Sequence, residues 1–240
     1  LNEYWHDVRF GKPVKHIEDV INICRMVIKE SHLNPIKYEG SEKSISLVGF
    51  DRPFTPKEAS IPIYMGSVGP FMTRKCGEIA DGWISHELCS PQYLKSNIIP
   101  KLQEGASDKK IPKIVVSGLT VVDEDEKKAK RIAAGTVAFY ASVKTYDEFF
   151  STHGFGQEAS RIRELFKNND IKGMIENVPD EMVDVFAIAG NKEFVTESIK
   201  RYENIVDEIK LTPPTHFVTE EETRFAQKSI LSIVNEGGIN

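Results

Sequence analysis

The stretch IPIYMGSVGPFMTRKCGEIADGWIS, residues Ile61–Ser85, decides the fold of this chain. Its apolar start over 61–66 is typical of a buried parallel strand, and a second short strand is expected over 82–86. Between the two strands, Pro70 stands at a position suited to the first turn of a helix, and apolar residues then recur on one helical face. The stretch therefore predicts a βαβ unit with a glycine-rich turn at the carboxyl end of its first strand.

The turn Gly66-Ser67-Val68-Gly69 has the features of a phosphate-binding loop. Glycine lets a ligand approach the backbone closely, and the first amides of the following helix have no partner within the helix. Those amides and the helix dipole favour an anion, most often a phosphate. Ser67 adds a possible hydroxyl donor. Glycines also occur in such turns merely to make the corner, so the spacing alone leaves both interpretations open.

Composition indicates a globular chain with one sizeable core. The chain has 240 residues, of which 40% are hydrophobic and 28% charged. A net charge of −5 and the lack of a long Lys/Arg run argue against a nucleic-acid partner. No apolar run approaches membrane-spanning length and no signal peptide is recognisable, so we expect a cytoplasmic protein without a membrane partner.

Cysteine and histidine usage does not predict a metal site. Three cysteines are too few and too scattered for a disulfide framework or a cysteine-rich metal site. The histidines lack metal-binding spacing such as HxxxH. We therefore expect no metal.

The rest of the chain alternates strands with helices, which predicts an α/β fold with a parallel sheet and right-handed crossovers. Within it, 31–60 is expected to be a hairpin and loop excursion, and 142–180 an insertion or lid segment of a single domain, 1–240. Besides 61–66 and 82–86, strands are expected over 36–40, 44–47, 113–122 and 207–211.

Helix boundaries follow from capping patterns. Asp123 with Glu126, and Thr219 with Glu222, match the capping box at two helix starts. The first of these helices carries Tyr140 on its apolar face. The segment 179–189 is expected to be helical, with Gly190 as its C-terminal stop.

The segment PIYMGSVGPFMTRKCGEIADGW, residues 62–83, resembles the fifth-strand segment of the luciferase-like monooxygenase superfamily. The resemblance is strongest to the branch that uses coenzyme F420, a deazaflavin. This branch includes methylenetetrahydromethanopterin reductase and the F420-dependent glucose-6-phosphate dehydrogenase. It covers nearly all of the chain and implies a TIM (β/α)8 barrel, of which this chain forms roughly the second half, with an insertion after the third strand–helix unit.

An isolated half barrel would leave two unpaired parallel edges, which favour aggregation. We therefore expect this chain to be the C-terminal part of a longer protein. The alternative is a shortened relative that completes its sheet by self-association, and the family resemblance itself implies a homodimer.

The resemblance also implies cofactor-binding residues. In the family, the glycine-rich turn receives the phosphate of the flavin or deazaflavin side chain, which assigns Gly66, Ser67, Val68 and Gly69 to that role. The opening Leu1-Asn2-Glu3 resembles the end of a family motif in which an asparagine contacts the deazaflavin. Asn2 is therefore a candidate cofactor contact, with a simple helix cap as the alternative.

Polar residues follow the strand at 82–86, at the end that forms the catalytic face of a barrel. His86 and Glu87 are candidates there for binding substrate or moving a proton, with a solvated loop pair as the alternative. In the insertion, TYDEFFSTHGF is rich in aromatic residues, which either cover a planar ring or pack as a satellite core. The predicted substrate pocket consists of Ser85, His86, Tyr146 and Phe149.

Three functions remain open at this point. The first is an oxidoreductase that moves a hydride between coenzyme F420 and a small organic substrate, with the cofactor carrying the hydride chemistry. The second is an FMN-dependent monooxygenase of the same family. The third is a non-catalytic flavin-binding relative that keeps only the phosphate-binding turn.

Overall fold

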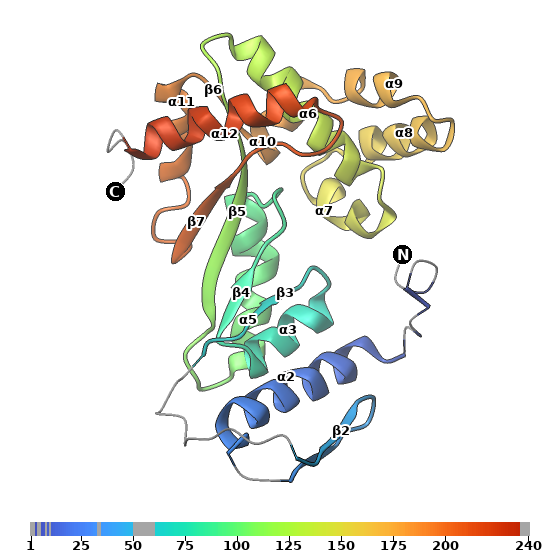
Figure 1. The fold of residues 1–240 in the computed structure, drawn as a ribbon. Coiled ribbons are helices and arrows are strands. Elements are labelled where there is room, and N and C mark those ends of the chain that lie inside the picture. The colour runs from blue at the N-terminus through green and yellow to red at the C-terminus, as the bar shows by residue number, and fades with distance from the viewer. Residues whose placement is uncertain are drawn as a thin grey trace. The chain divides into compact units, whose positions relative to one another are not determined.

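The computed structural model describes residues 3, 6, 7, 9, 11–32, 35–49 and 61–235, and the chain divides into two compact units (Figure 1). The first unit consists of Leu1–Trp83 and Pro100–Lys113. The second unit consists of Ile84–Ile99 and Ile114–Asn240.

The first unit begins with an amphipathic helix, α2 (Pro13–Glu30), and a hairpin. Proline at the start of α2 provides a preset backbone angle, and Ile21 on its apolar side is 2% exposed. The predicted hairpin is confirmed: β1 (Ile36–Glu39) pairs antiparallel with β2 (Ser44–Leu47). The unit continues with β3 (Tyr64–Gly66), α3 (Pro70–Ile79), β4 (Gly82–Ile84) and α5 (Ile99–Ala106).

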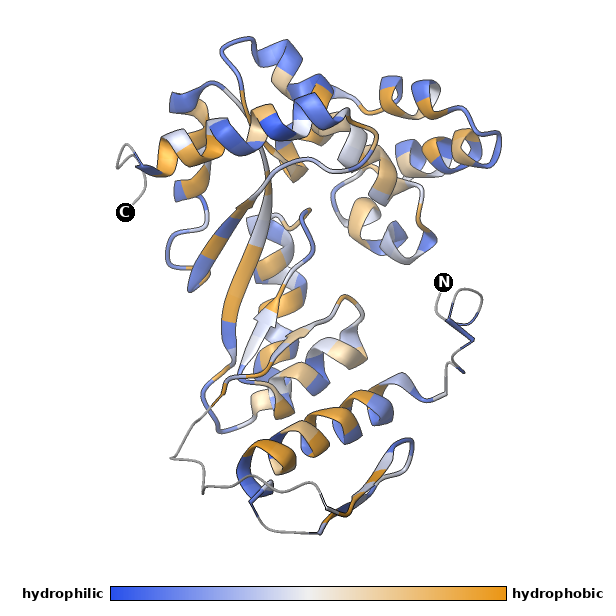
Figure 2. Ribbon diagram, in the orientation of Figure 1, coloured by the Kyte–Doolittle hydropathy of each residue, from blue (hydrophilic) through white to orange (hydrophobic). Residues whose placement is uncertain are grey.

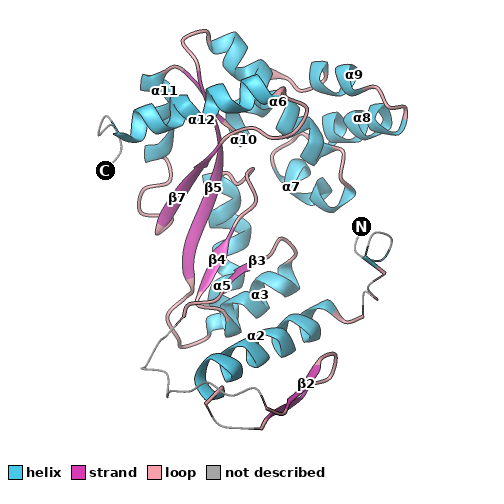
Figure 3. Ribbon diagram, in the orientation of Figure 1, coloured by secondary structure: helices cyan, strands magenta, loops and turns pink. Residues whose placement is uncertain are grey.

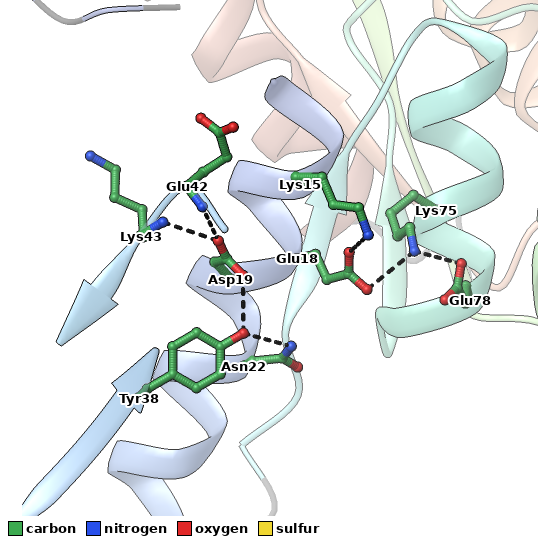
Figure 4. A network of polar contacts seen from close by, with 9 residues as sticks. All are labelled: Lys15, Glu18, Asp19, Asn22, Tyr38, Glu42, Lys43, Lys75 and Glu78. Atoms are coloured by element: carbon green, nitrogen blue, oxygen red, sulfur yellow. Dashed lines mark hydrogen bonds and ion pairs between the residues drawn. The ribbon is translucent and has the colours of Figure 1, made fainter. Parts of the chain in front are cut away.

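A buried carboxylate holds the hairpin against α2 (Figure 4). One oxygen of Asp19 accepts hydrogen bonds from the amides of Glu42, at 2.7 Å, and Lys43, at 3.0 Å. Its other oxygen accepts from the hydroxyl of Tyr38 at 3.0 Å. Asp19 is 5% exposed, and these donors, led by the two amides, lower the pKa of its carboxyl group. The turn of the hairpin is thus positioned by a side chain of the helix.

The predicted βαβ unit is present as β3, α3 and β4, with β3 next to β4 in the sheet. The first strand is shorter than expected, because it begins at Tyr64 rather than at residue 61. Asp81 ties the two strands together: its amide donates to the carbonyl of Ile63 at 3.0 Å, and its carboxylate accepts from the amide of Ile63 at 2.8 Å. The sequence pattern thus predicted the unit but not the bounds of its first strand.

The second unit is built on β5 (Lys113–Val122), the longest strand described. Every residue of β5 after Lys113 is buried, and Figure 2 colours most of the strand as hydrophobic. β5 pairs in parallel with β7 (Glu208–Thr212) along 115–119. At its carboxyl end, 120–122, it pairs in parallel with β6 (Ile188–Gly190). This arrangement confirms the α/β class with parallel strand pairing.

The prediction of a helix through residue 189 was wrong. The helix α10 (Asp180–Phe186) ends early, and Ala187 has an extended backbone with φ −127° and ψ 161°. The next three residues form β6, in which all three are buried against β5. Alanine and glycine have weak strand propensity, so pairing with β5 rather than local preference determines this conformation.

Helices form the rest of the second unit (Figure 3). α6 (Glu126–Ala141) begins at Asp125, whose carboxylate accepts from the amide of Lys128. Asp123 is therefore not the cap that the sequence predicted. The other helical elements of the unit are α4 (Pro91–Tyr93), η1 (Leu94–Ile98), η2 (Lys144–Tyr146), α7 (Asp147–Thr152), α8 (Gly156–Lys167), α9 (Ile171–Glu176), α11 (Lys192–Lys200) and α12 (Glu220–Asn235).

We predict that Asp19→Ala detaches the hairpin from α2, because two amides and a hydroxyl lose their acceptor. Hydrogen exchange of the hairpin amides should accelerate relative to the wild type. Because the pKa of Asp19 is lowered from 3.8, its stabilising effect is complete above that value and lost as the pH falls through the lower, folded-state pKa. The control is Glu39→Ala, which removes an exposed carboxylate from the same hairpin. Equal exchange in both variants would contradict the assignment.

Candidate functional site

The first candidate site is the turn between β3 and α3 in the first unit. Gly69 precedes the helix with an extended backbone, φ −77° and ψ 153°, and Pro70 occupies the first helical position. The amide of Thr73 donates to the carbonyl of Gly69 at 2.9 Å, which closes the first turn of the helix. The amides of Phe71 and Met72 precede that first helical bond, so helix geometry leaves them free to bind an anion.

Ser67 does not present its hydroxyl as the sequence suggested. The residue is 7% exposed, and its hydroxyl donates to Oγ1 of Thr73 at 3.1 Å. The indole N–H of Trp83 donates to both the hydroxyl and the carbonyl oxygen of Ser67, at 3.0 and 3.1 Å. Ser67 therefore fixes the shape of the turn, and any anion there would be bound by backbone amides.

The turn also has room for a ligand at Gly69. A Cβ atom built on Gly69 would have no other atom within 4 Å, and the residue is exposed. Gly66 is exposed as well, and Val68 is partly buried. Asn2, the other predicted cofactor contact, lies outside the described residues.

The second candidate site follows β4 in the second unit, where backbone bonds fix Ser85, His86 and Glu87 along β5. The amide of Ser85 donates to the carbonyl of Val115, and the amide of Leu119 donates to the carbonyl of Glu87, both at 3.0 Å. The hydroxyl of Ser85 accepts from the amide of Ser117 at 2.8 Å and donates to the carbonyl of His86 at 2.7 Å. Ser85 thus has a structural role in this segment.

Glu87 accepts a hydrogen bond from the hydroxyl of Tyr140, which lies near the end of α6. Tyr140 is 9% exposed, and burial together with the carboxylate of Glu87 raises its pKa. The phenol therefore stays protonated at neutral pH and acts as the donor. The sequence placed Tyr140 on the apolar face of its helix, because a partner 53 residues away leaves no local signal.

His86 is enclosed by aromatic rings from two other segments. Its ring stacks on Tyr140 at 5.3 Å and makes edge contacts with Tyr146 at 5.0 Å and Phe149 at 5.4 Å. Its Nδ1 accepts from the amide of Leu88 at 3.2 Å, which places the proton of the neutral ring on Nε2. Burial lowers the pKa of His86 to about 4. His86 is therefore a neutral hydrogen-bond donor at physiological pH.

The structure thus brings His86, Tyr146 and Phe149 of the predicted pocket into contact. A further residue of this cluster, His216, comes from the loop after β7. Its ring stacks on Phe139 with centroids 3.8 Å apart, and it lies 6.1 Å from Tyr140. In the sequence it is one isolated histidine, and no local pattern connects it with Tyr140.

The loop that carries His216 approaches α6 closely because residue 135 is glycine. A Cβ atom at Gly135 would lie 2.8 Å from the carbonyl oxygen of His216 and 3.2 Å from that of Phe217. Phe217 itself has φ +56°, a conformation that is strained for a bulky side chain. Such strain is often found near functional sites, where the surrounding packing holds it.

Among the described residues, no group of three His, Cys, Asp or Glu side chains could hold a metal ion. None of the helices in the described part of the chain combines the length and apolar character needed to cross a membrane.

Comparison with known proteins identifies a protein family that this chain matches. The family model described as luciferase-like monooxygenase matches residues 2–208. The 5,10-methylenetetrahydromethanopterin reductase of Archaeoglobus fulgidus is 28% identical over 201 residues, 80% of this chain and 58% of that protein. The enzyme of the same name from Methanopyrus kandleri is 30% identical over 171 residues, 69% of this chain and 48% of that protein. The chain thus spans about half the length of these curated relatives.

A solved structure shows the same fold. It is the coenzyme F420 dependent tetrahydromethanopterin reductase from Methanopyrus kandleri, with a TM-score of 0.74 at 23% identity, covering 92% of this chain and 63% of that one. The predicted class, an α/β fold of the TIM-barrel family, is thereby confirmed.

We predict that Tyr140→Phe lowers the free energy of unfolding by about 1–2 kcal/mol, because it leaves the partly buried carboxylate of Glu87 without its donor. The same change in a Glu87→Gln background should cost about 1 kcal/mol less, because a neutral amide is easier to leave unpaired. Urea unfolding of the four proteins of this cycle measures the difference. Tyr146→Phe is the control, since it removes a hydroxyl from a neighbouring ring. Additive effects of the two substitutions would contradict the pairing.

Proposed function

This chain belongs to the luciferase-like monooxygenase family, and on that premise we propose that it is an oxidoreductase that moves a hydride between coenzyme F420 and a small organic substrate. The observation that carries the proposal is the glycine turn between β3 and α3, which ends at the free amides of a helix. Relatives with 28% and 30% identity are 5,10-methylenetetrahydromethanopterin reductases, which favours the F420 branch over the rest of the family.

The residues of the turn fit a phosphate. The segment 66–73 contains no carboxylate, so nothing in it repels an anion. Gly69 is exposed and has free space where a side chain would lie, which allows a phosphate oxygen to approach the backbone. We propose that the amides of 66–69, together with those of Phe71 and Met72, hold the coenzyme phosphate. Asn2 remains a proposed contact on the strength of its motif alone.

The bound deazaflavin would supply the hydride chemistry, and the residues of the chain would bind and orient the reactants. We assign the reacting substrate to the cluster in the second unit, with Tyr146 packing against an apolar part of it. Phe149 is only 1% exposed, so it supports the pocket from behind through its contact with His86. His86 would donate a hydrogen bond from Nε2, because its lowered pKa keeps it neutral. Glu87 is the proposed proton acceptor or donor, held by Tyr140.

Two alternative functions are an FMN-dependent monooxygenase and a non-catalytic flavin-binding protein. FMN also carries a phosphate on its side chain, so the same turn suits an FMN-dependent monooxygenase. A non-catalytic flavin-binding relative would retain the turn but would not need a hydrogen-bonded Glu87–Tyr140 pair. We favour the F420 enzyme because of its reductase relatives. A small-molecule substrate, a homodimer and a cytoplasmic location remain predictions from the sequence.

The test is a fluorescence titration of the protein with F420 and, separately, with FMN. We expect F420 to bind more tightly. Gly69→Val should weaken F420 binding by about tenfold or more, because the side chain occupies the space of the phosphate while amide bonds to a charged group are lost. A Cβ atom at this position meets no other atom within 4 Å, and the backbone is extended, a conformation that suits valine, so the fold should be preserved.

Gly69→Ala provides a graded control with a smaller side chain, and thermal unfolding checks that both variants fold. A preference for FMN would support the monooxygenase. Unchanged F420 binding in Gly69→Val would contradict the phosphate assignment, and binding of neither coenzyme would contradict the proposed function.

A further inference from the structure

A partly buried hydrogen bond joins the insertion to the start of the helical segment that follows β4. Oγ of Ser90 lies 2.7 Å from Nε2 of His153, and Ser90 is 3% exposed. The same Oγ caps α4, because it accepts from the amide of Tyr93 at 3.0 Å. His153 directly follows α7, and its Nδ1 lies 2.8 Å from the carbonyl oxygen of Phe149. One imidazole therefore bridges α7 and α4.

The partners determine the protonation state of this bridge. A carbonyl oxygen only accepts, so Nδ1 of His153 carries the proton and donates to Phe149. In the neutral ring Nε2 is then an acceptor, and the hydroxyl of Ser90 donates to it. Ser90 can do this while its oxygen accepts from Tyr93, so every polar atom of the bridge is satisfied.

The ring of His153 is surrounded by aromatic side chains from three helices. Its centroid lies 6.2 Å from that of Tyr93 in α4, 5.2 Å from Phe149 in α7 and 4.9 Å from Phe186 in α10. Aromatic packing on several sides lowers the local polarity around the ring, which strengthens its hydrogen bonds.

The burial of Ser90 rules out a nucleophilic role for this serine. A serine–histidine pair resembles part of a catalytic dyad, but a nucleophile has to reach its substrate. Ser90 is nearly inaccessible, and the nitrogen of His153 that would face an orienting carboxylate is bonded to a carbonyl instead.

We propose that His153 is a positioning residue of the substrate pocket: through its bond to Ser90 it holds α7, and with it Tyr146 and Phe149, against His86. α7 begins directly after Tyr146 and carries Phe149, and both rings contact His86. We call this bridge, Ser90–His153–Phe149, the latch. The assignment of this pocket to a substrate rests on the proposed function. The latch itself is tested without any coenzyme.

The latch should depend on pH. When His153 is protonated, Nε2 becomes a donor, so the hydroxyl proton of Ser90 loses its acceptor and a charge is placed in partly buried surroundings. Burial lowers the pKa of His153 below its ordinary value of 6.5, so the opened state takes up the proton more readily than the closed state. The latch is therefore intact above pH 6.5 and weakens as the pH falls below it towards the folded-state pKa.

Other ionisable groups are present on the elements that pack around His153. Tyr93 contacts it directly, and burial and Glu148 of α7 raise the pKa of Tyr93 to about 12, so that this phenol does not titrate in the relevant range. Asp147 of α7 is paired with Arg163. Asp184 of α10 is paired with Lys130. His86 contacts Phe149, and burial lowers the pKa of His86 to about 4, so this ring stays neutral in the pH range in which the latch is tested.

The experiment is hydrogen exchange by mass spectrometry on the full chain without coenzyme, following peptides that cover α7. His153→Phe keeps a ring in the cluster but loses both hydrogen bonds, and Ser90→Ala removes the bond from the other side. We expect each to raise the exchange rate of α7 by about tenfold at neutral pH, with β5 unchanged. Ser160→Ala, which removes a serine–backbone bond within α8, is the matched control and should leave α7 unchanged.

His153→Gln separates the hydrogen bond from mere packing, because its side-chain oxygen accepts from Ser90 but does not titrate. We expect this variant to retain most of the protection of α7 and to show protection factors that do not fall on acidification from about pH 7.5 to about pH 5, unlike the wild type. Wild-type exchange rates in both His153→Phe and Ser90→Ala would overturn the latch. An equal pH dependence of exchange in the wild type and in His153→Gln would overturn the claim that protonation of His153 controls the latch. Neither result depends on F420 or FMN binding, so failure of the latch and failure of the proposed function are separate outcomes.

Discussion

The burial of β5 is the constraint on which the second unit depends. Nine consecutive residues of this strand are buried, so their backbone groups have to find partners within the protein. They do so with β7 along the middle of the strand and with β6 at its carboxyl end. The segment after β4 bonds to β5 as well, which fixes Ser85 and Glu87. Because these strands are parallel, their following segments gather at one end of the sheet, where Glu87, Tyr140 and His216 meet.

The parts of the fold that local physics specifies were predictable from the sequence. The β-branched run of β5, the glycine–proline boundary before α3 and the Thr219–Glu222 capping box all appear where the pattern indicated. The predictions that were wrong concern residues whose conformation depends on partners elsewhere in the chain or on competing hydrogen bonds. β6 looks helical in sequence because its strand conformation comes from pairing with β5, and the cap of α6 is Asp125 because Asp123 accepts from the amide of Asp125 instead.

In the candidate sites, too, local features were predictable from the sequence and long-range contacts were not. The positions of the glycine turn and of His86 and Glu87 followed from the sequence, whereas the roles of their side chains did not. Ser67 looked like a free donor, but its hydroxyl is bonded to Thr73 and Trp83. Tyr140 looked like a core residue, but it holds the carboxylate of Glu87. Hydrogen-bond partners far apart in the chain decide what a polar side chain can offer a ligand, and a single sequence does not contain that information.

We propose that the glycine turn binds the coenzyme phosphate through backbone amides. A crystal structure of the protein in complex with F420 tests it most directly. We expect the phosphate oxygens to lie within about 2.7–3.2 Å of amide nitrogens in the segment 66–72, with Ser67 still bonded to Trp83. A phosphate bound elsewhere on the chain, or held there by lysine or arginine side chains instead of these amides, would contradict it.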